Sequence, residues 1–451
     1  MISYAIQYAI FVAIAAFAYY AMAPRHRWLV LVATGTAALA LVGPLHLAVA
    51  AVFVFVNFAS ALLIARWLDT RRATITLVVT IVFDVFVLAT FKYGNALLSL
   101  DLVLPLGISY YAFQVIGYNL EVYWGRADVE PHLGRFASSI LFFPKLAAGP
   151  IERPHRFLAQ LDQNKRTTSI DVIAGLRQIG WGVFKKCVVA DRLGMVIDPI
   201  YSAPHEHAGV ALMAVIVLYP IQIYNDFSGY TDVALGSARL FGIELTPNFN
   251  HPFSATSVSE FWRRWHMSLT SWTTDYVYKP LSLYMRNSRA GLVAATLITF
   301  VVLGLWHGDR LNFVLFGLMH GVAVAVESAL PRRGREAPRL PPRVANALTF
   351  AFYSLTCVFF RASRPSDAIA IIHRAFTTVT ARSGIRDVVH SQDLAVLAAV
   401  ALATIAARRA MGTRTLAETP AWLRWSIHYA IACAIVVLGV LQADRFVYAQ
   451  F

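Results

Sequence analysis

Two histidines that could act as general bases lie in the second half of this chain, each directly after a tryptophan. His266 ends the segment EFWRRWH at 260–266, and His307 ends an 18-residue stretch, 290–307, that carries no charge before its histidine. A neutral imidazole can accept a proton near neutral pH. Because an ionisable group at membrane depth is costly, such a histidine is a candidate functional residue. The alternative for His307 is a histidine bonded to a carbonyl at a helix end.

Three further polar residues lie within or beside apolar runs. His320 is followed by a glycine, and a packed histidine bonded across two helices is favoured over a ligand contact. Asn225 and Asp226 open the segment NDFSGYTD, which predicts a break in a membrane helix that lines a cavity. They could orient a histidine or form a structural polar cluster. The histidines and cysteines lack metal-ligand spacing, so no metal site is predicted.

The composition is that of a membrane protein. The 451 residues are 58% hydrophobic and only 14% charged, against about 25% charged residues in soluble proteins. The net charge of +14 is dispersed in short runs between apolar segments. This pattern favours basic cytoplasmic loops over nucleic-acid binding. The three cysteines suggest neither a disulfide framework nor a zinc site, and no cleavable signal peptide is evident.

Apolar runs long enough to cross a bilayer recur along the chain, and they predict roughly ten to twelve crossings of an all-α polytopic protein. Arginines at 25, 27, 66, 71 and 72 fall on one side, which predicts an outside N-terminus. The expected spans are 3–22, 28–43, 45–65, 74–91, 103–123, 210–224, 290–307, 312–330, 345–360, 394–407 and 425–441, with 92–95 as a connection between two of them.

Between 124 and 192 the apolar runs become too short to cross a membrane. Residues 136–150 suit a re-entrant segment covered by protein, and residues 169–193 suit a helix in the cytoplasmic interface. Ser257 followed three residues later by Glu260 predicts a capped helix start. Residues 331–343 are expected to form a cytoplasmic loop, and residues 367–390 an amphipathic helix with a loop.

Several motifs together resemble the membrane-bound O-acyltransferase family. The resemblance is to its bacterial branch, which acetylates alginate or exports D-alanine onto teichoic acid. It covers about 104–451 and is weakest in the first hundred residues. The motifs are LPLGISYY at 104–111, FP at 143–144, AGPI at 148–151, DFSGY at 226–230, EFWRRWH at 260–266, LWHG at 305–308, HG at 320–321, FFRA at 359–362 and FVYAQF at 446–451.

The resemblance implies a ring of tilted helices around a thin central layer, where two funnels meet at a catalytic histidine. It assigns that role to His307 and makes His266 the second family histidine. We expect one domain over 1–451, with variable helices at 1–100, a catalytic core at 104–330 and C-terminal helices at 331–451. The candidate substrate-binding residues are Trp306, Arg263, Arg264, Trp265, Asn225, Asp226 and His320.

Transfer of an acyl group from a thioester to a hydroxyl needs a base, a stabilised oxyanion and exclusion of water. His307 fits the base, whereas His266 could be a second base, position the donor or close the entrance. Arg263 and Arg264 could bind the phosphates of coenzyme A or a phosphopantetheine arm. Membrane topology alone would also place two arginines at the cytoplasmic end of a helix.

The sequence therefore predicts a membrane O-acyltransferase of a bacterial inner membrane, with no bound cofactor. It would move a short acyl group, acetyl as first choice, from a cytoplasmic acyl-CoA or acyl carrier protein thioester toward a cell-surface glycan. The resemblance implies an extracytoplasmic acyltransferase partner, similar to the SGNH hydrolases. The alternatives are D-alanyl transfer to teichoic-type acceptors, a transporter with broken helices, a scaffold of a polysaccharide synthase, and acyl transfer to a lipid or protein.

Overall fold

The computed structural model describes residues 2–163, 168–207, 209–329, 340–378, 391–411 and 418–440, and within these ranges the regular elements are all helical. The loop expected at 331–343 and the ending at 446–451 fall largely or wholly outside them. Seven of the described helices are long and apolar enough to cross a membrane, and two shorter apolar helices accompany them. The predicted all-α polytopic class is confirmed.

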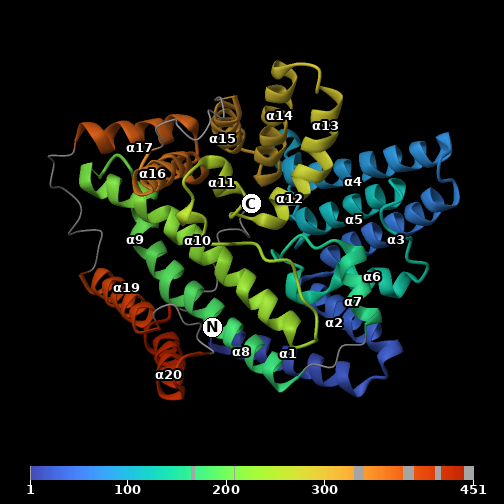
Figure 1. Ribbon diagram of the computed structural model, residues 1–451, viewed down its shortest axis with the longest axis horizontal. Helices are drawn as coiled ribbons and strands as arrows, with labels where there is room; N and C mark the ends of the chain where they lie inside the picture. The colour runs from blue at the N-terminus through green and yellow to red at the C-terminus, as the bar shows by residue number, and fades with distance from the viewer. Residues whose placement is uncertain are drawn as a thin grey trace.

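The N-terminal part forms a layer of long helices on one side of the molecule (Figure 1). Apart from α1 (Ile2–Ala21), which lies nearer the middle of the molecule, it consists of α2 (Arg27–Val42), α3 (Pro44–Arg66), α4 (Arg71–Leu98) and α5 (Ile108–Tyr123). Buried amides tie the last three helices together. The Asn57 amide donates to Asp84 over 2.9 Å, and the Asn119 amide donates to Asn57 over 2.6 Å. Such interhelical hydrogen bonds compensate for burying polar groups in a membrane layer.

The connection predicted at 92–95 is wrong, because α4 continues through it to Leu98. The physical reason is that its polar side chains find acceptors on another helix. Lys92 donates to the carbonyl of Trp306, and the Tyr93 hydroxyl donates to that of Leu305. One glycine in this segment is not enough to end the helix.

The middle of the chain is made of short helices, as the short apolar runs predicted. These are α6 (Leu133–Leu141), the 3₁₀ turn η2 (Phe143–Lys145), α7 (Pro154–Asp162), α8 (Ser169–Phe184), the π-helical segment η3 (Lys185–Ala190) and α9 (Asp191–Ser202). The helix expected at 169–193 therefore extends further, through the π-helical segment into α9. Figure 1 shows α8 lying alongside α10 (Gly209–Arg239).

The break predicted at 225–232 is also wrong, since α10 is continuous over this segment. Its acids are paired with the π-helical segment, as in the 2.6 Å ion pair between Lys186 and Asp226. Its glycine serves helix packing, because a Cβ on Gly229 would lie 2.8 Å from the carbonyl oxygen of Gly182 on α8. Small residues allow helix backbones to approach this closely.

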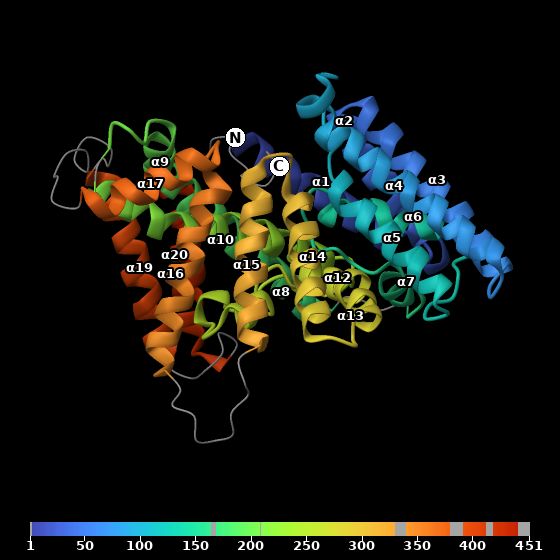
Figure 2. The ribbon, with the colours of Figure 1, turned by 90° about the horizontal axis from the view of Figure 1, so that it is seen from above.

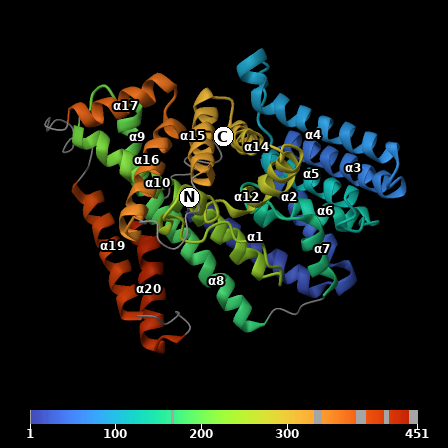
Figure 3. The same cartoon turned by 45° about the horizontal axis from the view of Figure 1, so that its top comes forward.

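The helices that carry the candidate residues lie near the middle of the molecule, between the N-terminal layer and the C-terminal helices (Figures 1 and 3). They are α11 (Val258–Trp262), α12 (Met267–Thr273), the π-helical η5 (Thr274–Tyr278), α13 (Lys279–Tyr284), α14 (Arg289–His307) and α15 (Leu311–Ala329). Beyond them lie α16 (Pro342–Arg361), α17 (Pro365–Thr377), α19 (Ser391–Met411) and α20 (Ala421–Leu438).

The pair α14 and α15 stands upright at the centre in Figure 2. Glycines set their close approach. A Cβ on Gly304 would meet the carbonyl oxygen of Phe313 at 2.4 Å, and one on Gly317 would meet that of Phe300 at 2.2 Å. This crossing fixes the end of α14, where His307 lies.

Candidate active site

His307 is the last residue of α14, and the extended Gly308 ends the helix behind it. Its side chain is 5% exposed, and Gly308 is also buried, whereas residues 309–311 beyond it are exposed. The imidazole packs edge-to-face against Trp306 and Phe360, each with ring centroids 5.1 Å apart. His307 therefore lies at the boundary between the apolar interior and an open side of the molecule.

His266 lies immediately before α12 and is 1% exposed. Its backbone is left-handed, with φ 42°, a conformation that costs a non-glycine residue about 1–3 kcal/mol and is typical of functional sites. The ring lies edge-to-face on Phe227 at 4.7 Å. Among the described residues, neither ring nitrogen hydrogen-bonds to another residue. A buried imidazole in this condition can still offer both nitrogens to a ligand or water.

Trp306 joins the two histidines. Its ring packs edge-to-face against His307 at 5.1 Å and against His266 at 5.9 Å. The indole nitrogen donates to the carbonyl of Ser109 over 3.2 Å. The sequence prediction grouped His266 and His307, and the structure brings them to the same tryptophan. Trp306 fixes the side chains around it and exposes only 7% of its own surface.

Motifs that are far apart in the sequence converge around these three residues. Residue 109 of the 104–111 motif bonds Trp306, and Ile151 of the 148–151 motif donates its N–H to Ser268, two residues past His266, over 3.0 Å. Phe227 of the 226–230 motif contacts His266, and Phe360 of the 359–362 motif contacts His307. With the two motifs that carry these three residues, the fold therefore gathers six separate segments at one place.

The helix start before His266 is the one that Ser257 and Glu260 predicted. The Ser257 hydroxyl accepts from the N–H of Glu260 over 3.1 Å. The Glu260 carboxylate accepts from the N–H and the hydroxyl of Thr256, both over 2.8 Å, and pairs with Arg264 over 2.7 Å. These hydrogen bonds from Thr256, followed by the pairing with Arg264, lower the pKa of Glu260 below its ordinary value.

The two arginines differ in surroundings. Arg264 is bound to Glu260 and also donates to the hydroxyl of Ser254 over 3.0 Å. Arg263 is exposed and lines a cavity of about 310 Å³ between the α11–η5 segment and α14 with α15. The structure therefore separates a structural arginine from one that faces open space.

This cavity is lined by hydroxyl groups as well as apolar side chains. Those at positions 270, 273, 274, 296, 299 and 328 donate to backbone carbonyls three to five residues before them. Each hydroxyl oxygen then retains a lone pair for a donor on a ligand. On α14 the lining residues Thr296, Thr299 and Leu303 share a face with His307. From Thr296 to His307 this face rises about 16 Å.

The remaining candidates are held by partners within the helices and the core. His320 accepts from the Trp262 indole over 3.2 Å, and its other nitrogen lies 3.0 Å from the Thr356 hydroxyl. Asp226 is bound to Lys186, and the Asn225 amide donates within α10 to Ile221 over 2.8 Å. Trp265 is 3% exposed and stacks on Phe261 at 5.5 Å, within the core.

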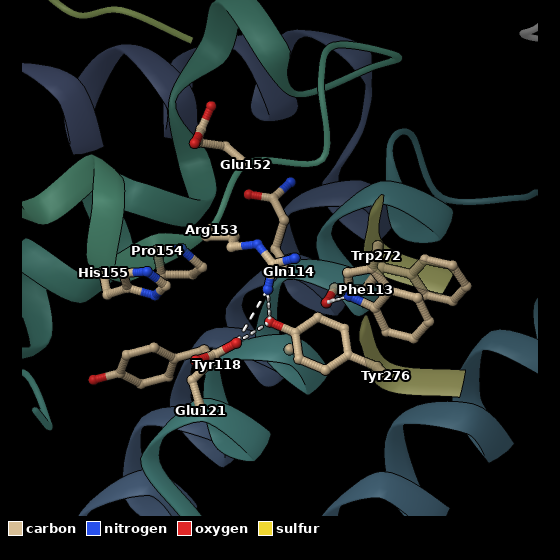
Figure 4. A pocket seen from close by; sticks show the side chains of 11 residues that line it. Phe113, Gln114, Tyr118, Glu121, Glu152, Arg153, Pro154, His155, Trp272 and Tyr276 are labelled. Carbon is tan, nitrogen blue, oxygen red and sulfur yellow. Dashed lines mark hydrogen bonds and ion pairs between the residues drawn. The ribbon is translucent and has the colours of Figure 1, made fainter. Parts of the chain in front are cut away.

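A charged cluster next to Trp272 of α12 and Tyr276 of η5 supports the site (Figure 4). Arg153 binds Glu121 over 3.1 Å and also contacts Asp275 and Tyr276 of η5. The void beside it measures only about 10 Å³, about one water molecule. Trp272, on the same wall, stacks on Phe113 at 3.8 Å. This cluster therefore fixes α12 and η5 and is too small for a substrate.

Comparison with known proteins identifies the family. Residues 127–364 match the family model described as MBOAT, the membrane-bound O-acyltransferase family. The chain is 34% identical over 316 residues to the probable alginate O-acetylase AlgI of Pseudomonas aeruginosa, covering 66% of this chain and 59% of that protein. It is 30% identical over 355 residues to the peptidoglycan O-acetyltransferase of Helicobacter pylori, covering 70% and 67%.

A third relative acts on a different acceptor. The teichoic acid D-alanyltransferase of Streptococcus thermophilus is 30% identical over 240 residues, which cover 51% of this chain and 58% of that protein. The match to the Pseudomonas protein spans about 59% of that protein's length. With its apolar helices and a family match over more than half of its residues, this multi-pass membrane protein belongs to the membrane-bound O-acyltransferase family.

Proposed function

We propose that this protein is an O-acyltransferase that passes a short acyl group, with acetyl as first choice, from a cytoplasmic thioester toward an extracytoplasmic polysaccharide. The names of the Pseudomonas and Helicobacter relatives support acetyl and a glycan acceptor. The observation that carries the proposal is the position of His307. It is buried at the end of α14, between a hydroxyl-lined cavity on the same helix face and an exposed segment beyond it.

The cavity suits the donor. The helix α14 begins directly after Arg286 and at Arg289, and the positive-inside rule assigns this end to the cytoplasm. Arg263 would bind a phosphate of acyl-CoA or of an acyl carrier protein. The pantetheine arm carries two amide N–H groups, which match the acceptor lone pairs of the lining hydroxyls. A donor seated in this way would point its thioester along α14 toward His307.

The proposed chemistry follows from a neutral imidazole at the end of this path. His307 would take the proton of the acceptor hydroxyl as its oxygen attacks the thioester carbon. The tetrahedral intermediate then collapses, the carbon–sulfur bond breaks, and the histidine returns its proton to the leaving thiolate. His266, whose nitrogens bond to no other described residue, would hydrogen-bond the thioester or the intermediate. Burial of both rings excludes water, which would otherwise hydrolyse the donor.

We further propose that a partner completes the transfer. An extracytoplasmic acyltransferase of the SGNH-hydrolase-like kind would receive the acyl group on the exposed side beyond His307 and pass it to the glycan. The location would be a bacterial inner membrane. The D-alanyltransferase relative makes D-alanine the second candidate group.

The test is acyl transfer in proteoliposomes supplied with radiolabelled acetyl-CoA, with and without the partner. We expect transfer by the wild type and a loss of about 100- to 10,000-fold in His307→Gln. His205→Gln, which changes a histidine with an exposed side chain, is the control and should be unaffected. Undiminished transfer by the His307 variant would refute the base assignment. If the protein transferred D-alanine from its carrier protein and did not transfer acetyl, D-alanine would replace acetyl as the proposed acyl group.

A further inference from the structure

Lys92 is a charged side chain in a membrane helix that the sequence interpretation assigned to a loop. It lies in α4, one of the candidate spans, and only 17% of that helix's apolar window is buried. A lysine in such a helix can extend its ammonium along the lipid-facing surface to water. Lys92 instead reaches inward, and its partners are residues of the candidate site.

The contacts of Lys92 converge on the end of α14. Its ammonium donates to the carbonyl of Trp306, lies 3.4 Å from the Ser109 hydroxyl and 5.2 Å from the centre of the Trp306 ring. It is also close enough to interact electrostatically with His307 and with Asp309. Ser109, in turn, accepts the Trp306 indole N–H through its carbonyl. Three helices, α4, α5 and α14, are thus joined through one ammonium.

The carbonyl that Lys92 binds has no partner within its own helix. The last four carbonyls of an α-helix lack intrahelical donors and form the negative end of the helix dipole. Trp306 is the second-last residue of α14. A cation at this position satisfies the carbonyl and interacts favourably with the dipole. Tyr93 binds the preceding carbonyl, that of Leu305, through a neutral hydroxyl.

We propose that Lys92 is a positioning residue for acyl transfer, which fixes the end of α14 and thereby the orientation of Trp306 and His307, and which supplies positive charge to the site. The positive charge favours the transition state, because negative charge develops on the thioester oxygen inside a site of low dielectric constant. This inference rests on the proposed function. It adds a residue from the N-terminal helices, the part of the chain where the family resemblance is weakest.

Variants at position 92 separate the hydrogen bond from the charge. Lys92→Met removes both, Lys92→Gln keeps a donor without charge, and Lys92→Arg keeps both. With purified protein in proteoliposomes, we expect kcat to fall about 100-fold in Lys92→Met and about tenfold in Lys92→Gln, with the KM for acetyl-CoA within about threefold. Lys92→Arg should stay within about fivefold of the wild type. A role confined to the hydrogen bond would not separate Gln from Arg.

Two neighbours on α4 provide matched controls. Thr90→Val removes a hydroxyl that bonds only to Phe86 of its own helix, and its activity should match the wild type. Tyr93→Phe removes the neutral donor next to Lys92, and it should lower kcat by no more than about threefold. A larger loss in Tyr93→Phe than in Lys92→Met would show that the charge is not the important part.

Hydrogen–deuterium exchange tests the positioning without relying on activity. The peptide covering 303–313 should exchange faster in Lys92→Met than in the wild type and in Thr90→Val, because the end of α14 has lost its anchor. Unchanged exchange there, or a kcat of Lys92→Met within twofold of an active wild type, overturns the inference. If the wild type transfers no acyl group from any donor, the proposed function fails, while the exchange result still decides whether Lys92 anchors α14.

Discussion

His320 and His266 are both buried histidines beside tryptophans, but they differ in what binds their nitrogens. His320 is 0% exposed, and Trp262 and Thr356 occupy its two nitrogens. His266 is 1% exposed, and among the described residues its nitrogens hydrogen-bond to no other residue. Native structures rarely leave buried polar groups unpaired. The difference indicates that His320 holds helices together, and it supports the proposal that His266 binds a ligand.

The arginines of the same segment show the same contrast. Arg264 is paired with Glu260, while Arg263 faces the cavity beside α14. Residues of the same type therefore have different roles. The bonding partner of each side chain indicates its role better than the residue type does. Substitutions at these residues should therefore have separable effects on activity and on stability.

The largest difference in activity should be seen between single substitutions of His266 and His320. His266→Gln should lower kcat/KM about 100-fold, because a hydrogen bond to the reacting group is lost in a desolvated site. His320→Gln should lower it by no more than about threefold in the folded fraction, because no ring nitrogen there faces a ligand. The comparison uses acyl transfer divided by the amount of folded protein. Size-exclusion chromatography in detergent measures that amount. Equal losses in the two variants would contradict the expected difference.

The next largest difference should be between the Arg263→Ala and Arg264→Ala variants, whose affinities for the donor should differ by about tenfold. Arg263→Ala should raise the KM for acetyl-CoA about tenfold with little change in kcat, because a charge-assisted phosphate contact of an exposed arginine is worth about 1.5 kcal/mol in binding. Arg264 is already paired with Glu260 and does not face the donor. Arg264→Ala should therefore change the KM for acetyl-CoA by less than about threefold. A donor without the nucleotide phosphates, acetyl-pantetheine, supplies the control, because Arg263→Ala should then resemble the wild type.

The sequence predicted much of this fold, because apolar length and capping are local properties. The boundaries of α1, α2 and α3, the helix ending at His307 and the cap at Ser257 all follow from residues that are adjacent in the chain. The two wrong predictions concerned polar residues whose partners are distant. Lys92 and Asp226 looked like helix interruptions, but Trp306 and Lys186 satisfy them across helices.

In the candidate site too, the sequence predicted what depends on local motifs and missed what depends on distant contacts. The motifs indicated His266, Trp306 and His307 together, and the structure places them in contact through Trp306. For His320 the sequence favoured a packed histidine bonded across helices, and its bonds to Trp262 and Thr356 agree with that. The sequence could not separate Arg264 from Arg263, since the distinction lies in tertiary contacts. Lys92 was missed, although a lysine that directly follows a long apolar run is itself a signal.

Stability should reverse the order of the two histidines. His320→Leu leaves the Trp262 indole N–H without its acceptor in the core, while the Thr356 hydroxyl keeps its bond to the Tyr353 carbonyl. It should destabilise the protein by about 1–3 kcal/mol. His266→Leu removes two nitrogens that bond to no described residue, so it should be neutral or stabilising. Thermal unfolding in detergent micelles measures both. A His266→Leu variant as unstable as His320→Leu would show that His266 has a structural role.

The smallest effect concerns Glu260, the residue that binds Arg264 and leaves Arg263 to the cavity. Its pKa is lowered by hydrogen bonds from Thr256 and then by Arg264, so its carboxylate adds stability above the unfolded pKa of about 4.3 and loses it as the pH falls through the lower folded value. Glu260→Gln should therefore lower the melting temperature slightly at pH 7, and the difference from the wild type should vanish below about pH 4. Asp171→Asn, which alters a different helix cap, that of α8, is the control for general acid sensitivity. If the Glu260 difference persisted in acid, the carboxylate charge would not be what stabilises this segment, and the separation of Arg264 from Arg263 would need another cause.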